Sequence, residues 1–335
     1  MGLEPLDDRR QAIVVTLSRT LPRLRRLLRD PVGVISRRLN ARVHPSHNPD
    51  LEKLSTFSRA AEQSGVQGLH LFLSFDSDTD MDISASQDVH TFLTSLGIKM
   101  TLAVPGTQLR NGAKTYRFLS ESGVEFINHG ELPHAKWQDD QYVSTTFYNE
   151  MSEAAVIEDI LNAHQTVTSI CGQAPKGFRA PHFGTFQSPD QLQLIYNVVK
   201  KLGYTYCSTT SPNLAHRYGP VIDMDGIVEL PTFGSFRSAD SILDSWSHLT
   251  DRRNYALGSL YGDLMVETVD VMLSMKMSGI LSWYADPCHV AGQESFERAM
   301  RHIAKCGIPS LSGHKAARLA PTPLRCTLGQ HERES

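Results

Sequence analysis

The chain lacks the features that would place it in or across a membrane. It contains no run of about 18 apolar residues, the length that a membrane-spanning helix needs. Its beginning has no compact apolar core followed by a cleavage site, because the stretch AIVVTL is short and acidic residues precede it. We therefore expect a cytoplasmic protein.

The sequence also lacks closely spaced cysteine pairs and a large net charge. The five cysteines are odd in number, widely spaced and never arranged as CxxC, so neither a zinc knuckle nor a disulfide framework is indicated. This usage fits a reducing compartment. A net charge of −3 gives no reason to expect a nucleic acid partner. Fourteen histidines, by contrast, keep metal and acid–base chemistry open.

Residues 1–50 differ in composition from the rest of the chain. They contain ten arginines and no lysine, and their apolar residues recur at roughly helical spacing. We predict a basic helical N-terminal extension, broken into short helices by Pro22 and Pro31, with a linker at VHPSHNPD. The helices either pack on the main domain with a solvated basic face or rest peripherally on the inner face of an anionic membrane.

Predicted helices and short apolar strands alternate over residues 51–320, and glycines mark most helix ends. This alternation predicts a mostly parallel sheet, either as a barrel or as an open sheet. Residues 321–335 are polar and predict a flexible tail. The predicted helices cover 51–64, 83–96, 113–122, 152–167, 189–202, 266–278 and 295–306, and the predicted strands cover 69–75, 98–104, 124–128, 177–179, 204–208, 227–231 and 280–285.

The first predicted strand, within LHLFLSFDSDTD, ends in three acidic residues, Asp76, Asp78 and Asp80. The carboxyl ends of parallel strands are where α/β folds usually place their chemistry. Asp76 and Asp78 are two residues apart, so on an extended chain both point to the same side. Two converging carboxylates repel each other unless a cation or a shared proton lies between them. The alternative is a solvated loop that caps the next helix.

Later predicted strands also end in polar residues. His129 and His134 follow VEFIN, and two imidazoles with one carboxylate form the ligand set of an open catalytic zinc site. Asp78 is the candidate carboxylate, which leaves Asp76 as a general base. The alternative is a pair of ordinary surface or core histidines.

Two further strand ends contribute candidates. Arg179, in FRAPHFG, either orients Asp76 through a bidentate contact or forms a structural salt bridge. His289, in DPCHVAG, follows the last clear strand, which in a closed barrel returns beside the first. It would then face Asp76 across the site as a general acid. Its alternative role is to cap the following loop.

Taken together, these stretches resemble the NodB-like polysaccharide deacetylases of carbohydrate esterase family 4. The resemblance covers about residues 66–313 and rests on five stretches in the family's order: SFDSD, NHGELPH, GFRAPHF, ADSILDSW and DPCHVAG. It implies an α/β fold, a distorted (β/α)7 barrel of the NodB homology type. By the resemblance, Asp76, Arg179 and His289 are catalytic, and Asp78, His129 and His134 bind the metal. It also implies a substrate-binding set of His182, Phe183, Asp244, Trp246 and Asp286.

Three departures from the family pattern stand out. The family's histidine pair is usually four residues apart, whereas His129 and His134 are five apart. His182 stands where the family usually has an aromatic residue after Arg-x-Pro. Asp286 competes with His289 for the role of general acid.

The expected function is metal-dependent hydrolysis, with zinc as the expected cofactor, of an N-acetyl or N-formyl group on a sugar. The expected substrate is an N-acylated saccharide, an intermediate of surface polysaccharide synthesis in the cytoplasm or at the inner membrane face. One alternative is hydrolysis of a non-sugar amide, such as a cyclic imide or ureide. Others are a non-catalytic carbohydrate-binding relative and a membrane-scaffolding role for residues 1–50. The sequence leaves a homo-oligomer open.

Overall fold

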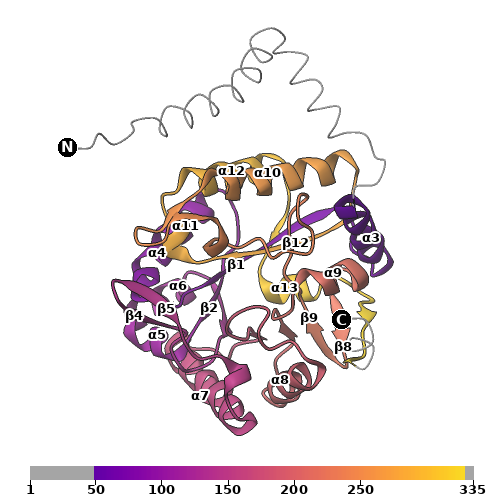
Figure 1. Ribbon diagram of the computed structural model, residues 1–335. Helices are drawn as coiled ribbons and strands as arrows, with labels where there is room; N and C mark the ends of the chain where they lie inside the picture. Colours follow the sequence, from indigo (N-terminus) through magenta and orange to yellow (C-terminus); the bar gives the residue numbers. More distant parts are fainter. Residues whose placement is uncertain (1–48, 329–335) are drawn as a thin grey trace, which may run out of the picture. The chain divides into compact units, whose positions relative to one another are not determined.

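The computed structural model describes residues 49–328, so the prediction for residues 1–48 lies outside the described part. Seven parallel strands form the centre of the fold, and helices surround them (Figure 1). In spatial order they are β12 (Gly279–Ala285), β1 (Leu69–Asp76), β2 (Thr101–Val104), β3 (Glu125–Asn128), β6 (Gly177–Phe178), β7 (Tyr206–Cys207) and β9 (Ile227–Glu229). This curled, mostly parallel sheet confirms the predicted distorted (β/α)7 barrel.

The strand β1 is central to the barrel and buried along almost its whole length. It pairs with β12 from Leu69–Gly279 to Phe75–Ala285, and with β2 on its other side. Leu71 and Leu73 join one apolar cluster, and Phe72 joins another, because successive side chains point to opposite faces. Burial on both faces explains the continuous apolar run. The last parallel strand does return beside the first.

An irregular segment after β9 connects the two ends of this strand order. The backbone N–H of Phe233 donates to the Ser282 carbonyl of β12 at 2.8 Å. The indole N–H of Trp283 donates to the Gly234 carbonyl at 2.9 Å. These bonds bring the chain after β9 against β12, which closes the barrel around the carboxyl ends of its strands.

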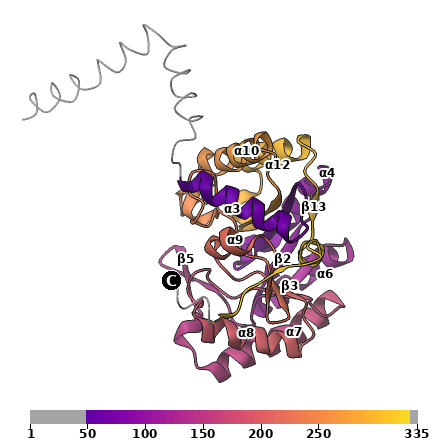
Figure 2. The same cartoon turned by 90° about the vertical axis from the view of Figure 1, so that its right-hand side faces the viewer.

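The helices lie outside the sheet. In α12, buried apolar residues recur at Phe296, Ala299, Met300 and Ile303, the spacing of one helix face. This helix packs beside α10, and α3 packs beside α9 (Figures 1 and 2). The long helices are α3 (Pro49–Gln63), α4 (Asp80–Ser95), α6 (Ala113–Glu121), α7 (Glu153–Cys171), α8 (Pro189–Lys201), α10 (Ser259–Ser274) and α12 (Glu294–Lys305). Within residues 49–328, no helix is long and apolar enough to cross a membrane.

Several elements were not predicted. Two hairpins project from the barrel: β4 (Ala135–Gln138) with β5 (Gln141–Ser144), and β10 (Leu249–Asp251) with β11 (Ala256–Leu257). The helix α10 begins seven residues before its predicted start at residue 266. The other short elements are α5 (Gly106–Asn111), η1 (Tyr148–Glu150), α9 (Pro212–Tyr218), β8 (Ile222–Met224), η2 (Trp246–His248), α11 (Pro287–Val290), β13 (Ser310–Leu311), α13 (Gly313–Ala317) and β14 (Leu324–Arg325).

The predicted flexible tail needs correction over residues 321–328. Within it, β14 pairs in parallel with β8, which is itself antiparallel to β9. The backbone N–H of Cys326 donates to the Asp223 carbonyl at 3.0 Å, and the Cys326 side chain is fully buried. This segment therefore extends the sheet, because a two-residue strand can form wherever an exposed sheet edge accepts it.

Candidate metal and catalytic site

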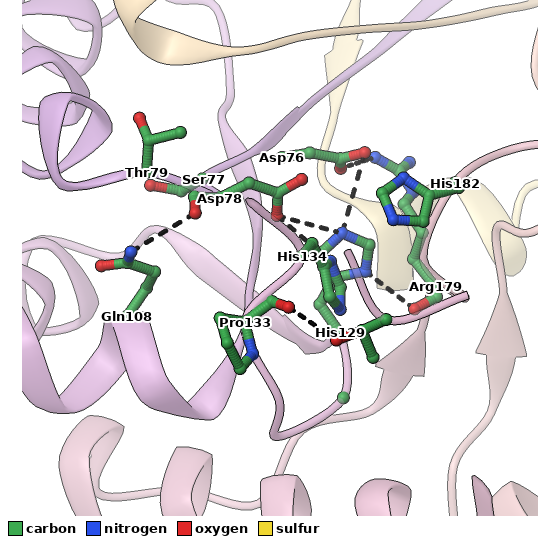
Figure 3. A network of polar contacts seen from close by, with 12 residues as sticks. Asp76, Ser77, Asp78, Thr79, Gln108, His129, Pro133, His134, Arg179 and His182 are labelled. Carbon is green, nitrogen blue, oxygen red and sulfur yellow. Dashed lines mark hydrogen bonds and ion pairs between the residues drawn. The ribbon is translucent and has the colours of Figure 1, made fainter. Parts of the chain in front are cut away.

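Three candidate metal ligands meet at the carboxyl ends of β1 and β3 (Figure 3). Asp78 Oδ1 lies 3.2 Å from His134 Nδ1 and 3.6 Å from His129 Nε2. One ligand atom of each residue lies within 4.8 Å of those of the other two. The positions at the strand ends therefore bring together the three residues that the sequence predicts as metal ligands.

The hydrogen bonding of His129 leaves one of its ring nitrogens free to bind a metal. Its Nδ1 lies 2.9 Å from the Arg179 carbonyl oxygen, which can only accept, so Nδ1 carries the proton. The lone pair of Nε2 then faces Asp78. Burial, together with the neighbouring His134, holds the pKa of His129 well below its usual value. The imidazole is therefore neutral, which is the form that binds a metal.

The buried polar atoms of Asp78 and His134 show whether the cluster suits a cation. Asp78 Oδ1 and both ring nitrogens of His134 are buried and, within the described chain, have no hydrogen-bond partner. Leaving such atoms unpaired costs about 1–3 kcal/mol each. Burial alone would raise the pKa of Asp78, but the contacts with His134 and His129 lower it. An ionised carboxylate beside the neutral imidazole of His129 and the ring of His134 fits a divalent cation such as zinc.

A second group of metal-binding residue types lies on the surface of α10 and α12. There His302 Nε2 bonds to Asp270 at 2.7 Å, and Cys306 Sγ lies 3.6 Å from the same nitrogen. This group already forms an ordinary exposed ion pair. It therefore serves as a contrast to the buried cluster, where the donor atoms lack partners.

The loop between the two histidines absorbs its extra residue through Asp159 of α7. Asp159 Oδ1 accepts the backbone N–H groups of Glu131 at 3.0 Å and Leu132 at 2.8 Å. Its Oδ2 accepts the Tyr148 hydroxyl at 2.6 Å. Gly130 has φ = 78°, and a Cβ there would lie 2.3 Å from Asp159 Oδ2, so this position requires glycine. The five-residue spacing is compatible with a common site for His129 and His134.

Arg179 is fully buried and holds Asp76. Its Nη1 donates to Asp76 Oδ1 at 2.5 Å, while Nη2 donates to the Ser74 and Ser208 hydroxyls at 2.7 and 3.1 Å. Its Nε donates to the Ser208 carbonyl at 3.1 Å. The other carboxylate oxygen of Asp76 lies 3.9 Å from His129 Nε2. One oxygen of Asp76 is thus anchored, and the other faces the metal-ligand cluster.

The two residues after Arg-x-Pro support the site from the side. His182, at φ = 54°, has Nε2 2.6 Å from the Thr145 carbonyl and stacks on Phe147 at 4.4 Å. Burial lowers the pKa of His182. Phe183 packs on Tyr284 at 4.7 Å and lies beneath the Arg179 guanidinium. In this structure, then, both predicted substrate-binding residues contact protein groups that border the site.

The late loop places His289 in a buried aromatic setting. Its ring lies edge-on to Trp246, with centroids 4.5 Å apart, and Ser245 Oγ lies 3.0 Å from its Nδ1. Its Nε2 is buried without a hydrogen-bond partner within residues 49–328. Asp286 Oδ2 lies 3.6 Å from Nδ1. Asp244 instead caps η2, because its carboxylate accepts the Ser247 N–H and hydroxyl at 2.7 and 2.8 Å.

Burial shifts the pKa values of Asp286 and His289 in opposite directions. Burial raises the pKa of Asp286 well above its usual value, and the charges of Asp82 and Asp78 add to the effect. Burial also lowers the pKa of His289 to about 3. Both shifts therefore favour the uncharged form, the protonated carboxyl of Asp286 and the neutral imidazole of His289.

Comparison with known proteins agrees with this geometry. Residues 65–207 match the family model described as polysaccharide deacetylase, a stretch that runs from before β1 to β7 and contains the three candidate ligands and Arg179. This stretch, somewhat under half of the chain, matches the polysaccharide deacetylase family. The NodB-like resemblance of the sequence is thereby confirmed.

Solved structures show the same fold. A protein from Mycobacterium smegmatis assigned as a polysaccharide deacetylase is 16% identical, with a TM-score of 0.58 over 76% of this chain and 90% of that one. One from Pseudomonas aeruginosa PAO1 with the same assignment is 13% identical, with a TM-score of 0.52 over 78% and 93%. PuuE allantoinase is 14% identical, with a TM-score of 0.51 over 75% and 89%. No curated protein matches the chain.

One supporting residue was missed by the sequence analysis. Asp82 Oδ2 accepts the Thr79 N–H and hydroxyl at 2.9 and 2.7 Å, and Oδ1 accepts the Cys288 N–H at 2.9 Å. Burial raises the pKa of Asp82 to about 6. Asp82 thus ties the start of α4, just after Asp78, to the loop that carries His289. The signal was present, since Thr79 and Asp82 have capping-box spacing.

Proposed function

We propose that this chain is a zinc-dependent hydrolase that removes an N-acetyl or N-formyl group from a sugar. The observation that carries the proposal is the buried, unpaired set of Asp78 Oδ1 and the two His134 nitrogens beside the neutral His129. These residues would hold the ion. When bound, it would polarise the amide carbonyl and lower the pKa of a water molecule.

Asp76 is the proposed general base. Arg179 holds Asp76 Oδ1, so the free Oδ2 faces the ligand cluster and can accept the proton of the attacking water. The rigid anchoring fixes the direction of the proton transfer, because Arg179 is itself held by Ser74 and Ser208.

In the proposed mechanism, Asp286 and His289 together supply the proton that the departing amine needs. Burial raises the pKa of Asp286 and so favours its protonated form, while His289 is neutral with an unpaired Nε2. The imidazole can receive a proton on Nδ1 and release one from Nε2 as the amine leaves. We therefore propose that the two residues act as the general acid together, rather than either one alone.

Metal content and acetate release test this function in the full chain. Asp78→Asn and His134→Ala should lose stoichiometric zinc and activity on N-acetylglucosamine oligosaccharides, while Asp76→Asn should keep zinc and lose at least 100-fold in kcat. His302→Ala, in the surface group, is the matched control and should retain both. Full activity in Asp76→Asn, or zinc retained by both ligand variants, would refute the mechanism.

The identity of the amide is tested in the same assay. The fold likeness to PuuE allantoinase makes cyclic ureides the second candidate class. We therefore expect acetate or formate release from N-acylated sugars and no turnover of allantoin. The reverse result would reassign the substrate while leaving the metal site intact. Membrane contact through residues 1–50, a cytoplasmic location and a homo-oligomer stay predictions.

A further inference from the structure

We propose that Trp137 and Tyr142, on the hairpin of β4 and β5, form an aromatic platform that binds the sugar ring next to the acylated one. The inference rests on the proposed function and assigns a place for the rest of its saccharide. It would make the protein act on a sugar within a larger glycan or glycoconjugate.

Trp137 is an exposed aromatic residue that lies close in sequence to the candidate ligand His134. The side chain is 58% exposed, whereas Trp283 is buried and Trp246 is half-buried. Single exposed apolar side chains are common on protein surfaces. This one, however, follows the ligand His134 by three residues. At about 3.3 Å per residue, the two Cα atoms lie about 10 Å apart. That distance is too long for contact with the reacting amide and suits contact with a neighbouring sugar.

The two aromatic residues occupy the same face of the hairpin. Trp137 pairs directly with Tyr142 across the two strands, and their ring centroids are 5.0 Å apart at 75°. Directly paired residues project to the same side. Burial raises the pKa of Tyr142, and the charges of Asp80 and Asp82 add to the effect.

The base of the hairpin is fixed to the site. The Thr145 N–H donates to the His134 carbonyl at 2.7 Å, and the Thr145 hydroxyl donates to the Pro133 carbonyl at 2.7 Å. His182 Nε2 lies 2.6 Å from the Thr145 carbonyl on the other side. These bonds hold the platform at a constant distance from the ligand His134. A rigid aromatic face offers apolar contact to the C–H face of a sugar while its polar edge stays hydrated.

Kinetics on two substrates test the platform. We expect Trp137→Ala to raise the KM for an N-acetylglucosamine tetrasaccharide about tenfold, with a smaller effect on kcat. The ratio of kcat/KM for the tetrasaccharide to that for the monosaccharide should fall to a similar extent. Trp137→Phe, which keeps an aromatic face, should restore most of the loss. Phe118→Ala, at a 47% exposed position on α6, is the matched control.

A binding measurement separates this inference from the proposed function. In an Asp76→Asn background, calorimetric titration with the tetrasaccharide should give about a tenfold weaker Kd when Trp137 is also replaced by alanine. If the wild-type protein deacetylates the tetrasaccharide but replacing Trp137 changes neither Kd nor KM, the platform is refuted and the proposed function stands. If binding depends on Trp137 but no acyl group is released, the platform stands and the function fails. No saccharide binding at all would overturn both.

Discussion

Replacing Arg179 by methionine would leave the carboxylate of Asp76 buried without its cation. Methionine keeps most of the apolar volume of the arginine side chain, so the change isolates the charge and the hydrogen bonds. The variant loses four donated bonds, one of them to the Asp76 carboxylate and the others to Ser74 and Ser208. Asp76 is 7% exposed, so water cannot replace the guanidinium.

The expected loss is large because a buried charge is left unpaired. Removing one partner of a buried ion pair destabilises a protein by about 3–5 kcal/mol, whereas an exposed pair contributes about 0–1 kcal/mol. Arg298 and Asp263 supply the exposed comparison, since their contact is 2.6 Å and both side chains are 46% exposed. The difference between these two ranges is at least about 2 kcal/mol. Arg179→Met should therefore lower the free energy of unfolding by at least about 2 kcal/mol more than Arg298→Met does.

Urea unfolding of the metal-free protein measures both variants without a contribution from bound zinc. Adding Asp76→Asn to Arg179→Met removes the unpaired charge, so the double variant should recover part of the lost stability. The interaction term of this double-mutant cycle should reach about 2 kcal/mol or more. If Arg179→Met costs no more than Arg298→Met, or if the double variant recovers nothing, Arg179 is not the residue that compensates the charge of Asp76.

Three other predictions follow from separate contacts. Asp159→Ala should weaken zinc binding about 10- to 100-fold in competition titrations, because it frees the loop that orients His134; unchanged affinity would refute this role. The pKa of His289 is lowered in the folded state, so its contribution to stability is present above pH 6.5 and is lost as the pH falls toward 3. In metal-free urea unfolding, the advantage of the wild type over His289→Asn should shrink by about 1.4 kcal/mol per pH unit below pH 6.5, and a constant difference would contradict it. A chain ending at residue 320 should lose about 2 kcal/mol, because it lacks the buried Cys326; a flexible tail would make no difference.

The sequence predicts best those parts of the fold whose signal is local and strong. The strand β1 combines a continuous apolar run with an abrupt acidic end, and both its position and its burial follow from that pattern. The strands β6 and β7 contain only two residues each, so their periodicity carries almost no information. Their place in the barrel followed from the alternation of helices around them and from the glycines at the helix ends.

The missed elements depend on contacts between distant residues or on unusual turns. The β4–β5 hairpin turns at Asp139 and Asp140, both at positive φ, where Asn-Gly or Asp-Gly is the usual signal. The tail forms β14 only because β8, about 100 residues earlier, offers it an edge. The bond from Cys288 to Asp82 joins residues 206 positions apart. Local pattern alone specifies none of these pairings.

The sequence could nominate the candidate site because the geometry of the site depends on strand ends more than on exact spacing. Two histidines five residues apart on a loop fix no distance between their rings. Two features bring His129 and His134 to Asp78. The strand β3 ends close to the end of β1, because β2 pairs with both. Asp159 also accepts hydrogen bonds from two backbone amides of the loop between the histidines. An insertion in such a loop is tolerated when an outside carboxylate can bond the extra backbone N–H. The arrangement of the three candidate ligands therefore depends on Asp159 as much as on the histidine motif, even though Asp159 lies on a helix that the motif does not include.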